Sequence, residues 1–174
     1  MAAIDLKGRV CVVTGSSQGL GMAMAQGLAK AGAKVVLTSI DEPNLTKVAD
    51  GIGRDKCLPI VADITSEPDC KRVVTETVKH FGDLAVLVNN ARHTGPRANR
   101  SILESEPPFW EKVIRTNIYG TYLMTFSTLP HLLKRGGGRI VNITTSLDTM
   151  QRRHYSPYGV TKTAIEADRK STRL

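Results

Sequence analysis

Cysteine, aromatic side chains and long apolar runs are all scarce in this chain of 174 residues. The three cysteines, Cys11, Cys57 and Cys70, are odd in number and form no C-x-x-C pair, and the four histidines lack metal-ligand spacing. We therefore expect neither a disulfide framework nor a metal site, and we expect Cys11, inside an apolar run, to be buried. The longest apolar runs, such as LAVLV, are strand-sized, which argues against a membrane span. MAAIDLKGRV at the N-terminus lacks the basic-then-apolar order of a secretory signal. The cysteine usage favours a reduced, cytoplasmic setting.

Positive charge is in excess, at a formal +8, but it is scattered and is not interleaved with aromatic side chains. A nucleic-acid partner is therefore not expected, because net charge bears on solubility and steering more than on fold. One local group nevertheless stands out among the basic residues, and it consists of Arg92, His93, Arg97, Arg100, Arg152, Arg153 and His154.

The overall composition, 41% hydrophobic and 23% charged, is that of an ordinary globular protein, and the length suits one domain over residues 1–174. Apolar runs rich in β-branched residues predict strands at 9–14, 34–39, 57–62, 84–90 and 139–144. Helical spacing predicts helices at 19–31, 44–51, 67–81 and 109–134. Alternation of the two predicts an α/β fold with a doubly wound, Rossmann-like parallel sheet, whose ligands bind beyond the carboxyl ends of the strands.

The first strand is followed by TGSSQGLG, residues 14–21. Glycines at 15, 19 and 21 allow a tight turn and a close approach to a pyrophosphate, which the helix N-terminus attracts. The spacing differs from the common dinucleotide fingerprint G-x-G-x-x-G. Asp63 ends the third strand and NNA, residues 89–91, ends the fourth, so polar groups gather at successive strand ends.

A second polar stretch, YSPYGVTK, covers residues 155–162. Pro157 suits the first position of a helix with Ser156 as its N-cap, which makes Tyr158 and Lys162 neighbours four residues apart. A lysine ammonium close to a phenol favours the phenolate, so we expect Lys162 to lower the pKa of Tyr158 and to prepare it for acid–base work. Tyr155 lies before the helix and is not expected to share this geometry.

Five stretches, TGSSQGLG, NNA, NIYG, RIVNITTS and YGVTK, resemble the motifs of the short-chain dehydrogenase/reductase family in order and separation. The likeness extends to about residue 167, and the glycine spacing is similar to that of the compact single-domain members. It implies an oxidoreductase that transfers a hydride between NAD(P) and a carbonyl or alcohol. Carried over, it makes Tyr158 the general acid/base, gives Lys162 a second role at the nicotinamide ribose, and assigns Asn117 to a proton-relay water.

The resemblance leaves one catalytic residue open. The family's serine falls by spacing on Thr145, whereas the nearest serine is Ser146, which we favour by residue type. The residues expected to bind the cofactor are Thr14, Gly15, Ser17, Gln18, Gly19, Leu20, Gly21, Ser39, Asp63, Ile64, Asn89, Asn90, Ala91, Tyr158 and Lys162.

The chain also departs from the family pattern. Arg92 replaces the usual glycine after NNA, where it either contacts cofactor or substrate or is merely tolerated in a loop. Ser39 stands where a carboxylate would select NAD, and Gln18 replaces the basic residue of some NADP-using members, so NAD and NADP both remain open. The basic group would flank the substrate cleft and suit an anionic alcohol or ketone, or else it is solvated loop charge.

After Ala167 the sequence reads DRKSTRL, which breaks the apolar stripe of the last helix. Family members continue through a sixth and usually a seventh strand, so we expect a C-terminally truncated fold with an exposed edge and a tendency to associate, as a homo-oligomer. The alternative to an active enzyme is an impaired or inactive nucleotide-binding fragment or interaction module.

Overall fold

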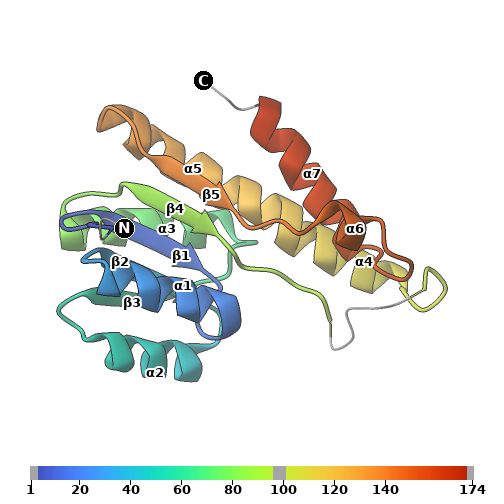
Figure 1. Cartoon of the computed structure of the whole chain (residues 1–174), viewed down its shortest axis with the longest axis horizontal. Coiled ribbons are helices and arrows are strands. Elements are labelled where there is room, and N and C mark those ends of the chain that lie inside the picture. Colours follow the sequence, from blue (N-terminus) through green and yellow to red (C-terminus); the bar gives the residue numbers. More distant parts are fainter. Residues whose placement is uncertain (1–3, 96–100, 172–174) are drawn as a thin grey trace.

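A computed structural model describes residues 4–95 and 101–171, and its central element is a parallel sheet (Figure 1). Within these residues the sheet has five strands in the order β3-β2-β1-β4-β5. Their bounds are β1 Val10–Thr14, β2 Lys34–Ser39, β3 Cys57–Val61, β4 Val86–Asn89 and β5 Arg139–Asn142. The predicted doubly wound α/β fold is confirmed, and the strand order reverses between β1 and β4, where such sheets bind ligands.

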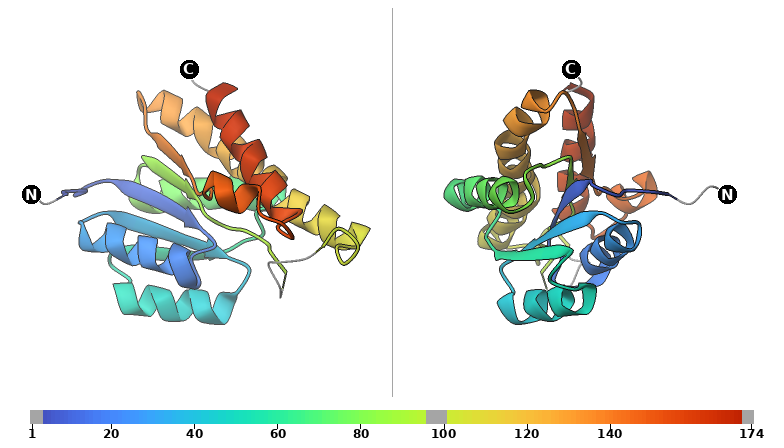
Figure 2. Two further views of the ribbon diagram at one scale, coloured as in Figure 1. Left: turned by 45° about the vertical axis from the view of Figure 1, so that its right-hand side comes forward. Right: turned by 90° about the vertical axis from the view of Figure 1, so that its left-hand side faces the viewer.

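Helices cover both faces of the sheet, as the end-on view in Figure 2 shows. Side chains alternate along β1, so that Val12 faces one core while Cys11 and Val13 face the other. The first core is closed by α3 (Glu67–Phe81) and α5 (Gly120–Lys134), and the second by α1 (Gly19–Lys30) and α2 (Glu42–Ile52). Each central strand is therefore buried on both sides, which explains its continuous apolar sequence.

The helix expected over 109–134 is instead three segments. It begins at Pro107 as α4 (Pro107–Ile114), passes through a π-helical turn, η1 (Arg115–Tyr119), and continues as α5. Nothing in the apolar periodicity announces the π turn, which inserts one residue into an otherwise regular helix.

The last part of the chain also differs from expectation. A short helix, α6 (Leu147–Met150), precedes α7 (Tyr158–Ser171) and was not expected. The final helix begins at Tyr158, so the expectation that Ser156 caps a helix starting at Pro157 is wrong by one residue. A Cβ on Gly159 would collide with the carbonyl of Met150, so this glycine lets α7 begin directly against α6.

Candidate active site

The glycine turn after β1 is packed too closely for side chains. Gly15 has a φ of +64°, and a Cβ there would lie 2.7 Å from the Cα of Ala91. A Cβ on Gly21 would collide with the Gly15 carbonyl and with the side-chain amide of Asn90. The turn therefore packs directly against the end of β4, and its other side lines the cleft described below.

The N-terminus of α1 differs from those of α2 and α3. The side chains of Asp41 and Ser66 cap α2 and α3, whereas Gln18, the N-cap of α1, makes no such hydrogen bond. The first-turn N–H groups of α1 therefore lack a side-chain cap and suit the phosphates of a dinucleotide. Together with the glycine turn, they fit the expected cofactor.

Buried polar side chains hold the ends of β1 and β4 together. The Thr14 hydroxyl accepts hydrogen bonds from the main-chain N–H groups of Asn90 and Ala91, both at 3.0 Å. Asn90 in turn donates through Nδ2 to the carbonyls of Thr14 at 2.9 Å and Gly15 at 3.1 Å. Asn89 points elsewhere, and its Nδ2 reaches Asn142 on β5 at 2.9 Å. Thr14 and Asn89 therefore hold the ends of β1, β4 and β5 together without lining the cleft themselves.

At the end of β2, two hydroxyl groups face each other. The Ser17 and Ser39 hydroxyls are 3.0 Å apart, and Ser39 Oγ accepts from the N–H of Asp41 at 3.2 Å. The Asp41 carboxylate is occupied at the start of α2, where it accepts from the side-chain amide of Asn44 at 2.8 Å. This end of the site is polar and carries no basic side chain among the residues that line it.

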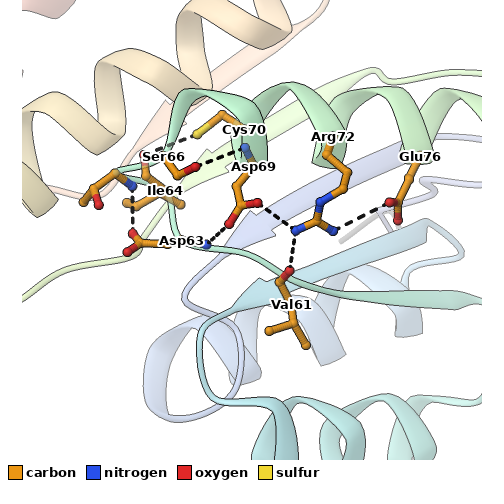
Figure 3. Close-up of polar contacts among 9 residues, drawn as sticks. Val61, Asp63, Ile64, Ser66, Asp69, Cys70, Arg72 and Glu76 are labelled. Carbon is orange, nitrogen blue, oxygen red and sulfur yellow. Dashed lines mark hydrogen bonds and ion pairs between the residues drawn. The ribbon is translucent and has the colours of Figure 1, made fainter.

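Asp63, at the end of β3, is held by the start of α3 (Figure 3). Its N–H donates to the Asp69 carboxylate at 2.9 Å, and its own carboxylate accepts from the N–H of Thr65 at 2.8 Å. Arg72 forms an ion pair with Asp69 and donates a hydrogen bond to the Val61 carbonyl, so it ties the end of β3 to the first turns of α3. These bonds hold the Asp69 carboxyl pKa below its ordinary value.

A continuous cleft of about 1230 Å³ runs along the carboxyl ends of the strands. The predicted residues among its lining are Gly15, Ser17, Gln18, Gly19, Leu20, Gly21, Ser39, Asp63, Ile64, Asn90, Ala91, Thr145 and Tyr158. Of the remaining predictions, Thr14, Asn89, Asn117 and Lys162 are buried just behind this lining, and Ser146 is exposed outside it.

Tyr158 and Lys162 are neighbours, as the spacing predicted. The Lys162 ammonium lies 5.6 Å from the centroid of the Tyr158 ring and donates to the Ile143 carbonyl at 2.5 Å. The lysine is only 2% exposed, and burial, aided by the nearby Arg92, lowers its pKa to about 8.

The expected lowering of the tyrosine pKa by Lys162 is not seen. Burial raises the pKa of the Tyr158 phenol, and the charge that opposes this rise comes from Arg92. The physical reason is that Lys162 directs its ammonium to the end of β5 and is itself penalised as a buried cation.

Asn117 clamps three parts of the site together from inside the π turn. Its Oδ1 accepts from the N–H of His93 at 2.7 Å, and its Nδ2 donates to the His93 carbonyl at 3.1 Å and to the Thr161 hydroxyl at 3.1 Å. It thereby joins the loop after β4, η1 and α7.

Thr145 and Ser146 differ in position. Thr145 lines the same cleft as Tyr158. The Ser146 hydroxyl serves as the N-cap of α6, where it accepts from the N–H of Thr149 at 3.3 Å and lies 2.9 Å from the Thr149 hydroxyl.

The basic group proposed from the sequence is divided. Arg92 and His93 line the cleft, and burial lowers the pKa of His93. Arg152, Arg153 and His154 are exposed outside the lining, although the Arg152 guanidinium lies 5.3 Å from the Tyr155 ring centroid. Arg97 and Arg100 lie outside the described residues.

Several lining residues were not anticipated. Lys112 and Arg115 contribute positive charge from the helical segment after the β4 loop, and their i, i+3 spacing was a signal that they share one face. Tyr155, set aside from the sequence, lines the cleft with its ring centroid 6.5 Å from that of Tyr158. The remaining unpredicted lining residues are Thr38, Ile40, Asp41, Ala62, Thr65, Thr94, Thr116, Ile143, Thr144 and Thr149.

Metal-binding clusters and membrane-spanning helices are both absent from the described residues. No cluster of three or more His, Cys, Asp or Glu side chains suited to a metal ion occurs among them. Over residues 4–95 and 101–171, no helix has the length and apolarity required to cross a membrane.

Comparison with known proteins gives a consistent family. The family model described as short chain dehydrogenase matches residues 9–173. A putative ketoacyl reductase of granaticin polyketide synthesis from Streptomyces violaceoruber is 35% identical over 87% of this chain. An uncharacterised oxidoreductase from Thermotoga maritima is 35% identical over 93% of it. The chain spans 60% and 63% of the length of these two relatives.

Among solved structures, a 3-ketoacyl-(acyl-carrier-protein) reductase from Brucella melitensis, complexed with NADH, superimposes with a TM-score of 0.89. It is 32% identical, and the match covers 96% of this chain and 69% of the reductase. The site described above thus lies in a fold that accommodates a bound nicotinamide dinucleotide in that protein.

Proposed function

Because the chain belongs to the short-chain dehydrogenase family, we propose that it is an oxidoreductase acting with NAD or NADP on an alcohol or a ketone. The observation that carries the proposal is the continuous cleft joining the glycine turn after β1 to Tyr158 at the start of α7. A dinucleotide placed along it would have its phosphates at the N-terminus of α1 and its nicotinamide towards Tyr158. Bound there, it supplies the hydride acceptor or donor.

A side chain of the protein transfers the proton. Tyr158 gives a proton to the substrate oxygen during reduction and takes it back during oxidation. A phenol is protonated near neutral pH, so Tyr158 is in the form that donates a proton in the reducing direction. Lys162 and Asn117 position this end of the site, one at the end of β5 and the other between three segments.

Thr145 is the hydroxyl that we assign to the substrate oxygen. Its position in the cleft lining supports this choice over Ser146, whose hydroxyl caps α6. A threonine hydroxyl both donates and accepts hydrogen bonds, so it can serve the carbonyl and the alcohol alike.

The charge of the cleft supports an anionic substrate. Arg92, Lys112 and Arg115 line the cleft, and of these the Arg92 guanidinium lies 6.0 Å from the centroid of the Tyr158 ring. The lining carboxylates, Asp41 and Asp63, follow β2 and β3 at the other end of the sheet. The positive charge of Arg92 therefore lies beside Tyr158, where the substrate would bind.

The proposal includes self-association. Tyr119, Tyr122 and Phe126 stack along one exposed side of the helix, with ring centroids 5.9 and 5.7 Å apart. An exposed aromatic stripe of this kind is typical of an interface. Sedimentation of the wild type and of Tyr122→Lys measures it, and a wild type that sediments as a monomer would contradict this part of the proposal.

The function is tested by titrating the purified chain with NADH and NADPH and then screening ketones and alcohols for turnover. We expect saturable binding of at least one cofactor and loss of turnover by about 10²–10⁴-fold in Tyr158→Phe, with cofactor affinity retained. Tyr122→Phe, outside the cleft lining, is the matched control. Binding without turnover of any substrate would favour a nucleotide-binding module, and a fully active Tyr158→Phe would refute the mechanism.

A further inference from the structure

The side chain of Arg92 occupies the cleft beside the proposed acid/base. Its guanidinium carbon lies 6.0 Å from the centroid of the Tyr158 ring, and both residues line the cleft. The guanidinium of another lining cation, Arg115, lies instead 5.8 Å from the centroid of the Tyr119 ring.

The guanidinium retains most of its hydrogen-bonding capacity. Nη1 donates to the Thr94 hydroxyl at 3.1 Å, which uses one of five N–H donors. Among the described residues no carboxylate lies within ion-pair distance of Arg92. The side chain is exposed to the cleft solvent and therefore open to a ligand.

The backbone that carries Arg92 is fixed. On its C-terminal side, both main-chain polar groups of His93 are held by the Asn117 amide, at 2.7 and 3.1 Å. On its N-terminal side, the N–H of Ala91 is held by Thr14. A planar cation on a fixed backbone is suited to bidentate recognition of a carboxylate.

We propose that Arg92 binds the carboxylate of the substrate and thereby directs the enzyme to oxo acids and hydroxy acids. The inference rests on the proposed function and names the substrate class for that site. The carboxylate lies against the guanidinium while the carbonyl or alcohol carbon faces Tyr158, so the two groups are close together in the same small molecule. A neutral analogue of the same shape leaves this pairing unmade.

The test compares each acid with its methyl ester: pyruvate with methyl pyruvate, and acetoacetate with methyl acetoacetate. The measured quantity is the acid-to-ester ratio of kcat/KM, because changes in the ionisation of Tyr158 affect both substrates and cancel. We expect the wild type to prefer an acid, and Arg92→Gln to lower the ratio about 10- to 100-fold through loss of a charge-assisted pair. Arg92→Lys should keep part of the preference.

Arg152→Gln is the matched control. Its guanidinium also lies over a tyrosine ring, that of Tyr155, but it is outside the cleft lining, so the ratio should not change. An unchanged ratio in Arg92→Gln would overturn the proposal. So would a loss of NADH affinity that equals the loss of turnover, since Arg92 would then contact the cofactor.

A chain that binds NADH but turns over neither acid nor ester would contradict the proposed function. The role of Arg92 is then measured by calorimetric titration of the protein–NADH complex with acetoacetate and its ester. Acid binding that is at least tenfold weaker in Arg92→Gln supports the inference, and equal binding overturns it.

Discussion

The Lys162 ammonium donates a hydrogen bond to the Ile143 carbonyl at 2.5 Å, which ties α7 to the residue that follows β5. Burial deprives the Lys162 ammonium of water, and one main-chain acceptor does not replace that solvation. The pKa of Lys162 therefore falls to about 8. Whether this charge is present therefore depends on pH within the range of ordinary assays.

This ionisation predicts a pH dependence of stability. The pKa of Lys162 is lower when folded than the value near 10.4 of an unfolded chain, so the unfolded state binds more protons between about pH 8 and 10. The free energy of unfolding therefore rises with pH in this window. Relative to Lys162→Met, the wild type should gain about 1–2 kcal/mol between about pH 7.5 and 9.5.

Urea unfolding of both proteins at several pH values measures this difference. The buried thiols of Cys11, Cys57 and Cys70 have raised pKa values and act in the opposite direction, but they are common to both proteins and cancel. A difference that is flat across the window would contradict the low pKa.

Gly21→Ala tests the close packing of the glycine turn. The added methyl group would collide with the Gly15 carbonyl and the Asn90 amide, so cofactor binding should fall at least tenfold, by about 1.4 kcal/mol or more. Gly27→Ala, in the same helix with no atom near the added Cβ, should instead stabilise the protein by about 0.5–1 kcal/mol. Fluorescence titration with NADH and thermal unfolding distinguish the two variants. An NADH affinity of Gly21→Ala equal to that of the wild type would contradict the proposed binding of the cofactor at the glycine turn.

Separate alanine substitutions distinguish the two hydroxyl residues. Thr145→Ala should reduce kcat about tenfold or more, because the substrate oxygen loses its hydrogen bond. Ser146→Ala should remain active and lose about 1 kcal/mol of stability, as expected for a lost helix N-cap. Turnover and unfolding are measured for both variants, and an inactive Ser146→Ala beside an active Thr145→Ala would reverse the assignment.

Asn117→Ala should damage both stability and activity. It leaves the His93 main chain without its two partners and Thr161 without its donor, at a cost of about 2–4 kcal/mol. Asn44→Ala, at an exposed amide, is the control and should cost less than about 1 kcal/mol. Because Asn117 positions the loop that carries Arg92, we expect the variant to raise KM for acids more than KM for esters.

Much of the fold could be predicted from the sequence, because each strand is a short apolar run that is buried on two faces. The sequence stretches around Val12 and Leu87 carry this signal without help from distant residues. Helix starts were predicted less well, since α2 begins at Glu42, after its N-cap Asp41, two residues before the apolar spacing indicates. The π turn at Asn117 and the short helix after Ser146 depend on packing between distant segments, which no local pattern contains.

The sequence indicates which residues line the cleft better than it indicates how they act on one another. The glycine turn, Asp63 and Tyr158 all line the cleft, since strand ends in a parallel sheet converge. Electrostatics was the weaker part: Lys162 was expected to act on Tyr158, but burial and the direction of its hydrogen bond cannot be read from an i, i+4 spacing. Arg92 was visible as a departure from a pattern, and only the fold brings it over the tyrosine ring.

The extra residue in η1 has a consequence for how this region tolerates change. One residue advances a helix by about 100°, so the turn puts α4 and α5 out of phase with each other. Phe109 of α4 can therefore face the His93 loop while Leu123 and Met124 of α5 enter the core beneath the sheet. Deleting a single residue here would give a more regular helix and a misaligned site, because one of these two surfaces would have to turn away from its partner.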